Sequence, residues 1–429
     1  MKLLAGTNVV EAPFITVQIG KYTFGCYKNS MRDGKTMARV NAPNYTKSVS
    51  IDKINGAVNQ YNIVLEYGIT QFSDPNYIEK VLSSIAGDRK IKLTYGDCNE
   101  PSFIYKNEEA LVTNVTSKVD FSSAKITYNI KAISTSTLAT SIVKDWPARK
   151  AKPSEIIRNI VQSNSYGLKQ IFTGMQDRNI IESEHLIATD DREIHIEAKQ
   201  NMNVFDYLNY LVSCMESITD SKAIYILTVY DTTDPPTNGP YFTVTKINSN
   251  VSKRNNIQEA FEVDVGFPTD TFVTDFQLQN DSAWSILYDY SQEQVHSNYS
   301  YLIDNDGELE RYDTNKLIQD TIKGVVEPEM QAWWNRVTEF PVRALLTVKG
   351  LLRPASLMQY VKINSFFYGQ KYIASGVYII TKQTDTIDQR GYRTTLELLR
   401  IAGDDLYEAE KSNRAYVSGS HGGRNRKHR

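Results

Sequence analysis

The stretch that decides the fold is AKITYNIKA, residues 124–132, in which Ile126, Tyr128 and Ile130 alternate with polar residues. A period of two places one row of side chains in a core and the other in water, as in a half-buried β-strand. The same alternation runs through NIVLEYGI, residues 62–69, and RKIKLTYGD, residues 89–97. Gly-Asp and Asn/Ser-rich breaks between these runs are typical of turns. These patterns predict an antiparallel sheet, rolled into a barrel, before the middle of the chain.

The middle of the chain changes period. From Pro153 the apolar residues follow helical spacing, with Pro tolerated in a first turn. A second helix is predicted from Asn203, whose spacing to Asp206 resembles a capping box. The runs AIYILTVY (223–230) and YFTV (241–244) predict a strand and its return strand, separated by a Pro- and Gly-rich turn.

The last third repeats the strand pattern of the first. A short helix is predicted near residue 330, followed by strands from Val342, from Gly376 and from Tyr392. The fold class is therefore predicted as α+β and β-dominated, with two small antiparallel β-barrel domains and a helix-containing insert between them. The predicted divisions are an N-terminal segment with the start of the first barrel (1–60), the first barrel (61–145), a helix-containing middle region (146–325), the second barrel (326–403) and a disordered basic tail (404–429).

Composition limits the classes of function. The formal net charge of −2 provides no overall positive field that would hold nucleic acid or an anionic membrane. Three widely spaced cysteines, Cys26, Cys98 and Cys214, predict buried thiols in a reducing compartment. No secretory signal and no apolar run of membrane-spanning length is recognised. The 27 tyrosines suit pleated surfaces and interfaces, because each has a large apolar body and a polar tip.

Motifs for catalysis are absent from the sequence. It contains no GxxxxGK[ST], no GxGxxG after a strand, no HExxH and no GxSxG. His185 and His195 are ten residues apart, which fits no common zinc spacing. We therefore predict no enzyme, no cofactor, and no catalytic, cofactor-binding or metal-ligating residue.

Several features allow a functional and a structural interpretation. The acidic run 304–310 suggests calcium, but counting back from Gly307 places Leu302 at the first ligand position, so a hairpin turn is favoured. The acid pairs Asp190-Asp191 and Asp404-Asp405 could serve glycoside hydrolysis or be solvated loop acids. The pair at 333–334, Trp-Trp, could line a sugar groove or belong to a core or subunit interface.

The C-terminal tail carries the one strong charge asymmetry. After Glu410 no acid follows, and the basic residues stand among Ser, Gly and Asn. Such a segment either stays a solubilising end or orders on an acidic partner or nucleic acid. The residues predicted for partner binding are Arg424, Arg426, Lys427 and Arg429.

The order of these elements resembles one family, the baseplate hub protein of contractile phage tails, with relatives in bacteriocin-like and type VI injection machines. The resemblance covers most of the chain from about residue 60 to about residue 400. The passages that carry it are GDRKIKLTYGD (87–97), KQNMNVFDYLNYLVSCM (199–215), LLRPASLMQYVKI (351–363), SGVYIITKQTDTID (375–388) and QRGYRTTLELLR (389–400).

The resemblance implies an assembly role without catalysis. Hub proteins of this family are trimers in which two similar barrels per subunit present six positions, matching the six-fold tail tube to the three-fold spike. The implied partners are further copies of the chain, the tube, the central spike, baseplate wedges and the tape-measure protein. DNA would pass through the bore without specific binding, and no membrane insertion is expected. The implied location is the virion tail baseplate, assembled in the host cytoplasm.

Two other classes remain open on the residues. One is a tail-associated β protein that binds or hydrolyses polysaccharide, which predicts a groove with clustered acids and aromatic residues. The other is a different tail or injection-machine subunit, which predicts a six-fold or elongated assembly.

Overall fold

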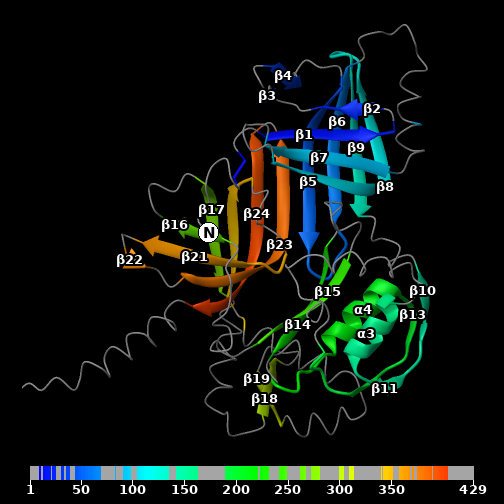
Figure 1. Cartoon of the computed structure of the whole chain (residues 1–429), viewed down its shortest axis with the longest axis vertical. Helices are drawn as coiled ribbons and strands as arrows, with labels where there is room; N and C mark the ends of the chain where they lie inside the picture. Colours follow the sequence, from blue (N-terminus) through cyan, green and yellow to red (C-terminus); the bar gives the residue numbers. More distant parts are fainter. Residues whose placement is uncertain are drawn as a thin grey trace, which may run out of the picture.

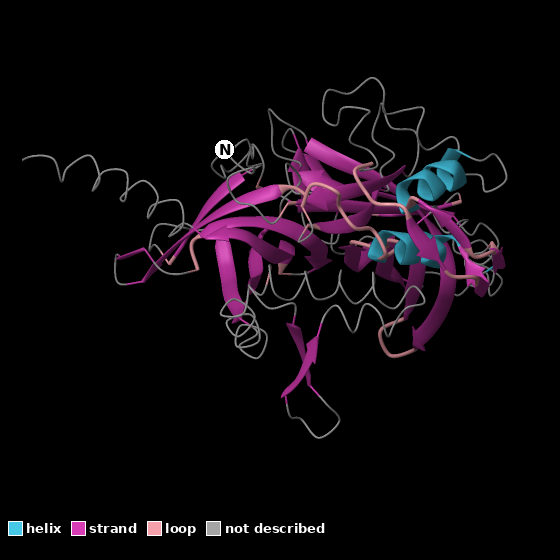
Figure 2. Ribbon diagram, turned by 90° about the horizontal axis from the view of Figure 1, so that it is seen from below, coloured by secondary structure: helices cyan, strands magenta, loops and turns pink. Residues whose placement is uncertain are grey.

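The structure is a computed structural model of the whole chain. It describes residues 9–10, 13–20, 22–25, 30–32, 35–38, 44–68, 83, 90–97, 104–134, 142–162, 189–220, 223–230, 241–248, 261–266, 272–280, 299–303, 309–313, 340, 342–350, 357–367, 370–371, 374–388 and 390–403. Within these residues strands dominate and only two long helices occur, which confirms the β-dominated α+β class (Figures 1 and 2).

The elements fall into three groups along the chain (Figure 1). The first strands are β1 (Pro13–Ile19), β2 (Tyr22–Phe24), β3 (Ser30–Arg32), β4 (Lys35–Ala38), β5 (Asn44–Ile54), β6 (Gln60–Gly68), β7 (Lys90–Asp97), β8 (Ile104–Asp120) and β9 (Lys125–Ser134). The insert contains β10 (Val143–Trp146), β11 (Arg149–Ala151), α3 (Pro153–Gln162), β12 (Ile194–Ile196), β13 (Lys199–Asn203), α4 (Val204–Ser213), β14 (Ile224–Tyr230) and β15 (Tyr241–Ile247). The last strands are β16 (Phe261–Val265), β17 (Val273–Asn280), β18 (Tyr299–Ile303), β19 (Leu309–Asp313), β20 (Val342–Lys349), β21 (Tyr360–Phe367), β22 (Gln370–Lys371), β23 (Gly376–Asp388) and β24 (Gly391–Gly403).

A single sheet of 14 described strands runs through both ends of the chain. Its main path is β17-β20-β24-β23-β5-β6-β9-β8-β7-β1-β2, and β21, β16 and β22 join it beside β23. The described pairing does not close into a barrel. The first part comes near to closing, because the N–H of Thr46 on β5 donates to the carbonyl of Gly25, next to β2, at 2.8 Å.

The predicted alternation of buried and exposed side chains is confirmed in β9. In β9 the side chains of Ile126, Tyr128 and Ile130 are buried, while Asn129 and Lys131 are exposed. These residues form the first core together with inward-facing residues of β1, β5, β6 and β7.

One residue of β6 departs from the alternation. Glu66, expected on the wet face, is 5% exposed. Its carboxylate lies 2.6 Å from the Nζ of Lys125 and 3.8 Å from that of Lys47. A buried carboxylate needs such cations, because burial without them costs several kcal/mol, roughly 3–5 on loss of a partner.

Both predicted helices of the insert are confirmed. α3 begins at Pro153, and Asp191 accepts hydrogen bonds from the N–H and the hydroxyl of Ser154 at 2.8 and 2.5 Å. α4 begins after Asn203, whose side chain accepts from the N–H of Asp206 at 2.7 Å. This is the capping interaction that the sequence predicted.

The two ends of the chain have the same strand order. We define the first module as β1, β5, β6, β7, β8 and β9, and the second module as β16, β17, β20, β21, β23 and β24. Counted along the chain, the six strands of each module pair in the order first, fourth, fifth, sixth, third, second. One pairing differs in direction, since β1 and β7 are antiparallel and β16 and β21 are parallel.

Irregularities in the strands recur at matching places. In β8 the register against β9 shifts at Thr113, and in β23 the register against β24 shifts at Thr381. Each threonine hydroxyl donates to a carbonyl of the neighbouring strand, Lys131 at 3.1 Å and Glu397 at 3.0 Å respectively. A second pair of shifts occurs where β5 meets β6 and where β17 meets β20. Since bulges are specific features of a strand, these coincidences support a duplicated architecture.

The insert covers one face of the second module. Ile224 and Ile247, on β14 and β15, pack with Ile379 and Leu399 of β23 and β24. Leu399 was expected on a wet face but is 5% exposed, because the insert lies over it. Helices α3 and α4 form a separate core with the other face of the β14–β15 hairpin.

Candidate assembly surfaces

The seam between the modules is a strand pairing of distant residues. β5 of the first module pairs antiparallel with the second half of β23, with Val49 facing Ile387 and Ile51 facing Asp385 (Figure 1). Across the seam the hydroxyl of Thr384 donates to Asp52 at 2.7 Å. The N-terminal half of the same strand, β23, pairs with β21 of its own module.

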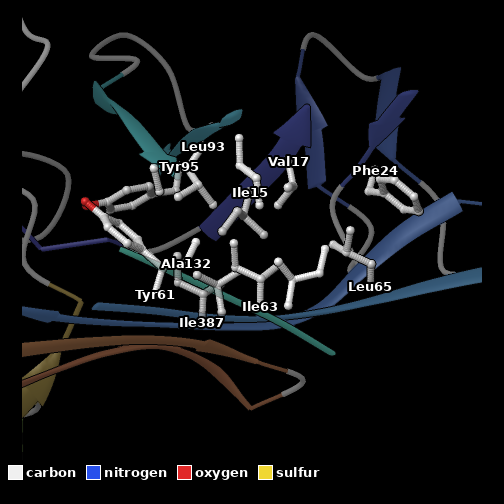
Figure 3. Packing of buried hydrophobic residues seen from close by; sticks show 14 of the residues in the cluster. Ile15, Val17, Phe24, Tyr61, Ile63, Leu65, Leu93, Tyr95, Ala132 and Ile387 are labelled. Carbon is white, nitrogen blue, oxygen red and sulfur yellow. The ribbon is translucent and has the colours of Figure 1, made fainter. Parts of the chain in front are cut away.

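A buried carboxylate lies in the first module close to this seam. Glu108 is 3% exposed and accepts hydrogen bonds from the hydroxyls of Tyr61 at 2.8 Å and Tyr95 at 2.6 Å. The Nζ of Lys53, on the seam strand β5, lies 2.5 Å from the same carboxylate. Figure 3 shows the two tyrosine rings converging at one end of the first core.

The second module contributes a polar group next to this network. The ring of Tyr392 meets that of Tyr95 edge-on, with centroids 6.1 Å apart. Asp385 is fully buried and accepts from Thr394 at 2.7 Å and Gln383 at 2.8 Å. Burial raises the pKa of Tyr95 well above its usual value, and the charge of Glu108 adds to this. The phenol therefore stays protonated and donates to the carboxylate.

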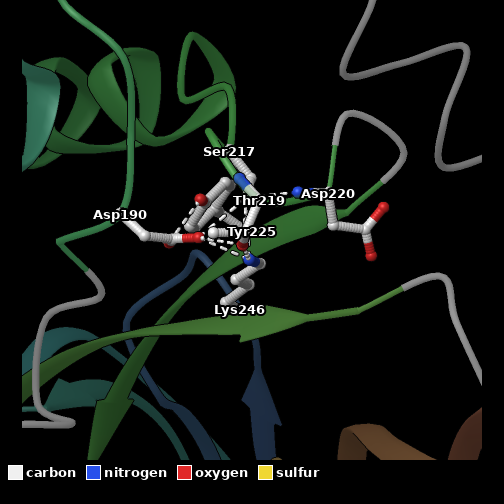
Figure 4. Close-up of polar contacts among 6 residues, drawn as sticks. All are labelled: Asp190, Ser217, Thr219, Asp220, Tyr225 and Lys246. Atoms are coloured by element: carbon white, nitrogen blue, oxygen red, sulfur yellow. Dashed lines mark hydrogen bonds and ion pairs between the residues drawn. The ribbon is translucent and has the colours of Figure 1, made fainter. Parts of the chain in front are cut away.

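A second polar network fastens the insert. Asp190 accepts from the hydroxyls of Tyr225 at 2.8 Å and Ser217 at 2.7 Å, and it forms an ion pair with Lys246 (Figure 4). The Nζ of Lys246 also donates to Ser217 and Thr219 at 2.7 Å. These contacts join the segment before β12 to both strands of the β14–β15 hairpin.

The pKa values of the adjacent acids move in opposite directions. Burial alone would raise the pKa of Asp190, but hydrogen bonds from Lys246, Ser217 and Tyr225 lower it to about 2. Burial raises the pKa of Asp191, and its hydrogen bonds from Ser154 offset part of that.

A cavity of 510 Å³ lies between the insert and the sheet. Its lining includes Ile226 of β14, Asn209 of α4, and Arg343, Lys382 and Glu397 of the second module. Glu397 is ion-paired with Lys382 at 2.7 Å. Hydrolysis of a glycoside needs two carboxylates that flank the bond, and the described residues of this lining supply one.

Several strand edges have no partner among the described strands, and two of them, on β17 and β8, matter for assembly. β17 pairs with β20 alone, so its other edge is open. β8 pairs with β7 only as far as Leu111, and beyond that residue it pairs with β9 alone. Exposed large apolar residues lie at this second segment, where Val119 is 36% and Phe121 80% exposed.

The residues singled out in the sequence have different outcomes. Asp190 and Asp191 are structural anchors of the insert, and His195 lies on β12 opposite Lys150. β18 and β19 form the expected hairpin, with Ile303 facing Leu309, although the turn between them lies outside the described residues. Among the residues that the structure describes, no group of His, Cys, Asp and Glu could hold a metal.

Other predicted sites lie outside the described residues. These are His185, Asp404 and Asp405, Trp333 and Trp334, and the tail residues Arg424, Arg426, Lys427 and Arg429. Of the cysteines, Cys214 is described, and it is buried with a free thiol. Within the described part, no helix has both the length and the apolar character needed to cross a membrane.

Comparison with known proteins gives similarity in structure alone. No family model and no curated protein matches the sequence. A tail protein from Neisseria meningitidis MC58 aligns over 91% of this chain and 97% of its own, with 8% identity and a TM-score of 0.49. The 43 kDa tail protein of prophage MuSo2 from Shewanella oneidensis aligns over 90% and 97%, with 11% identity and a TM-score of 0.48.

A third similar structure comes from a secretion machine. It is a component of the type VI secretion system of E. coli, aligned over 84% of this chain and 74% of its own, with 7% identity and a TM-score of 0.43. At these identities and TM-scores the likeness assigns no function, which has to come from the chain's own residues.

Proposed function

We propose that this chain is a non-enzymatic structural subunit of a contractile phage tail or a related injection machine, and that it serves there as the baseplate hub. Three copies form a ring whose six modules match a six-fold tail tube on one side and a three-fold central spike on the other. DNA passes through the bore without specific binding, consistent with a net charge of −2.

The observation that supports this proposal is the shared strand order of the two modules. Both pair their six strands in the same order, and register shifts fall at Thr113 and Thr381 in matching strands. The β5–β23 pairing joins the two modules edge to edge in one continuous sheet. A chain that already repeats one unit laterally is suited to continue that repeat around a ring.

The proposed partners are those that the resemblance to the hub family implies. Ring faces formed by sheet edges would contact tube, spike and wedge proteins, with the tape-measure protein at the bore. Arg424, Arg426, Lys427 and Arg429 are proposed as an arm for an acidic partner, since basic polar segments of this kind order on binding. The location proposed is the virion baseplate, after assembly in the host cytoplasm.

The mass of the purified chain in solution tests the proposal. Light scattering during size-exclusion chromatography is expected to give three times the chain mass of 48.8 kDa. A six-chain mass would favour a tube-like subunit instead. A chain that stays monomeric at high concentration and fails to bind tube or spike proteins would contradict the hub proposal.

Polysaccharide hydrolysis is the competing class, and the same preparation can test it. Incubation with cell-wall polymer is expected to release no sugar. Release that disappears in Glu397→Gln would instead make the cavity between insert and sheet an active site, because Glu397 is its acidic lining residue.

A further inference from the structure

We infer that the open edge of β17 pairs with residues 115–119 of β8 in a second copy of this chain, in the register that the internal seam already uses. This inference rests on the proposed ring and names the residues of its subunit contact. Its basis is the internal pairing of β5 with β23, read through the correspondence of the two modules.

The strands on each side of the seam have counterparts in the other module. β5 is the second strand of its module and β17 is the second strand of the other, and each pairs with the third strand through a register shift. β23 and β8 are the fifth strands, and each pairs with the sixth through a shift at a threonine. The seam inside the chain therefore joins a second strand to a fifth strand.

The remaining second strand and fifth strand lack this partner. β17 has one open edge, and β8 beyond Leu111 has one open side among the described strands. The corresponding strands inside the chain, β5 and β23, satisfy each other there. An exposed strand edge is a template for pairing with another chain, so these two segments are complementary.

The shifts fix the register of the inferred contact. Ile387 lies six residues after Thr381, as Val119 does after Thr113. In β5 the register against β6 shifts at Lys47, and in β17 the register against β20 shifts at Thr274. Val49 lies two residues after Lys47, as Phe276 does after Thr274. Because Val49 faces Ile387, Phe276 should face Val119 of the neighbouring copy.

The side chains at this register suit one another. Val119 is an exposed apolar residue, and Phe276 is only partly buried, so their contact would remove apolar surface from water. Leu278 and Ser117 correspond to the internal pair Ile51 and Asp385.

Polar positions on the opposite face also match. Thr116 would face Gln279, at the place where Thr384 donates to Asp52 inside the chain. Lys118 would face Gln277 and lie diagonal to Asp275, which places opposite charges within reach. The paired positions of residues 116–119 are thus chemically consistent, and the next position, where Asp120 would face Asp275, lies beyond the inferred contact.

Cysteine cross-linking tests the register. Directly facing residues of antiparallel strands have Cα atoms roughly 4.5–5.5 Å apart, which a disulfide can bridge. Oxidation of a mixture of V119C and F276C single variants is expected to give covalent dimers. The V119C/F276C double variant is expected to reach closed covalent trimers. Wild type, oxidised in parallel, gives the background from the native cysteines.

The matched control shifts the register by three residues. The pair V119C with Q279C would place the two sulfurs roughly 10 Å apart along the strand, so cross-linking is expected to fall at least fivefold. Equal cross-linking of both pairs would overturn the inferred register. A wild-type trimer with no V119C–F276C product would overturn the inference and leave the hub proposal standing, whereas a wild-type monomer that also binds no tube or spike protein would overturn both.

A charge substitution tests the same contact without disulfides. Val119→Asp places an unpaired carboxylate against the ring of Phe276 and is expected to weaken self-association at least tenfold. Ile218→Asp is the matched control, since Ile218 is 56% exposed on the insert and lies outside the contact. Equal association of the two variants and wild type would contradict the inference.

Discussion

The two modules share a strand order but differ in what they bury at the seam. The first module has a tyrosine and glutamate network there, with Glu108 bound by Tyr61, Tyr95 and Lys53. The position corresponding to Glu108 in the second module is Gly376, as the matching threonine shifts place it. The second core is mainly apolar and includes Leu346, Val348 and Ile363 among its fully buried residues.

The modules also differ at their edges. At the edge of the first module, the N–H of Thr46 on β5 donates to the carbonyl of Gly25, next to β2. The later residues of β5 pair with β23. In the second module β17 has no described partner beyond β20. One contact is made within the chain, and we infer that its counterpart forms with a neighbouring copy.

The largest effect is expected from breaking the polar network of the first module. Glu108→Ala would remove the buried carboxylate that the ammonium of Lys53 and the hydroxyls of Tyr61 and Tyr95 share. We expect a loss of about 3 kcal/mol in the free energy of unfolding. Guanidinium unfolding followed by tyrosine fluorescence measures it.

The neighbouring residue is the control for that substitution. Glu109 forms a more exposed pair with Lys92 at 3.6 Å, so Glu109→Ala should cost less than about 1 kcal/mol. Equal costs at 108 and 109 would mean that the buried network does not stabilise the first module.

A smaller effect is expected where the insert is fastened. Asp190→Asn removes the charge that holds Lys246, and we expect a loss of roughly 1–2 kcal/mol at neutral pH, discounted for partial exposure. Because the pKa of Asp190 is lowered to about 2 in the folded chain, its contribution is present above the ordinary Asp value and is lost as pH falls toward 2.

Thermal unfolding of wild type and Asp190→Asn between pH 6 and pH 2 measures that dependence. The difference in Tm between the two proteins should shrink below about pH 4. A difference that stays constant down to pH 2 would show that the ion pair is not its source.

The smallest effects sharpen the comparison of the modules. Thr113→Val and Thr381→Val each remove one hydroxyl-to-carbonyl bond at matching shifts. We expect each to cost about 0.5–1 kcal/mol, with similar values and additive behaviour in the double variant. Calorimetry of the four proteins would contradict the correspondence if one site cost several times more than the other.

Local sequence patterns predicted part of the strands and both helices of the insert, but β5, β8 and β17 were not predicted and long-range pairing lay beyond such patterns. Period-two alternation identified β6, β7, β9, β20 and β24, and the Asn203–Asp206 spacing identified the start of α4. The pairing of β5 with β23 joins residues more than 300 positions apart, which no local pattern encodes. The burial of Leu399 likewise depends on where the insert lies.

The candidate surfaces were less predictable than the strands. The abundance of tyrosine indicated interfaces or sheets, yet nothing singled out Tyr61 and Tyr95 as partners of Glu108. β8, on which Val119 lies, was not among the strands predicted from the sequence, and Val119 stands out only by its exposure beside an open strand side. The inferred contact depends on the strand-by-strand correspondence of the two modules, which is a property of the folded chain.

Electron cryomicroscopy of the purified oligomer tests the duplicated-module account most directly. We predict three copies around a central channel, with the β5–β23 seam and the β17–β8 contact between copies superimposing as six similar joints. A map with another number of copies, or with β17 and the end of β8 facing solvent, would contradict it.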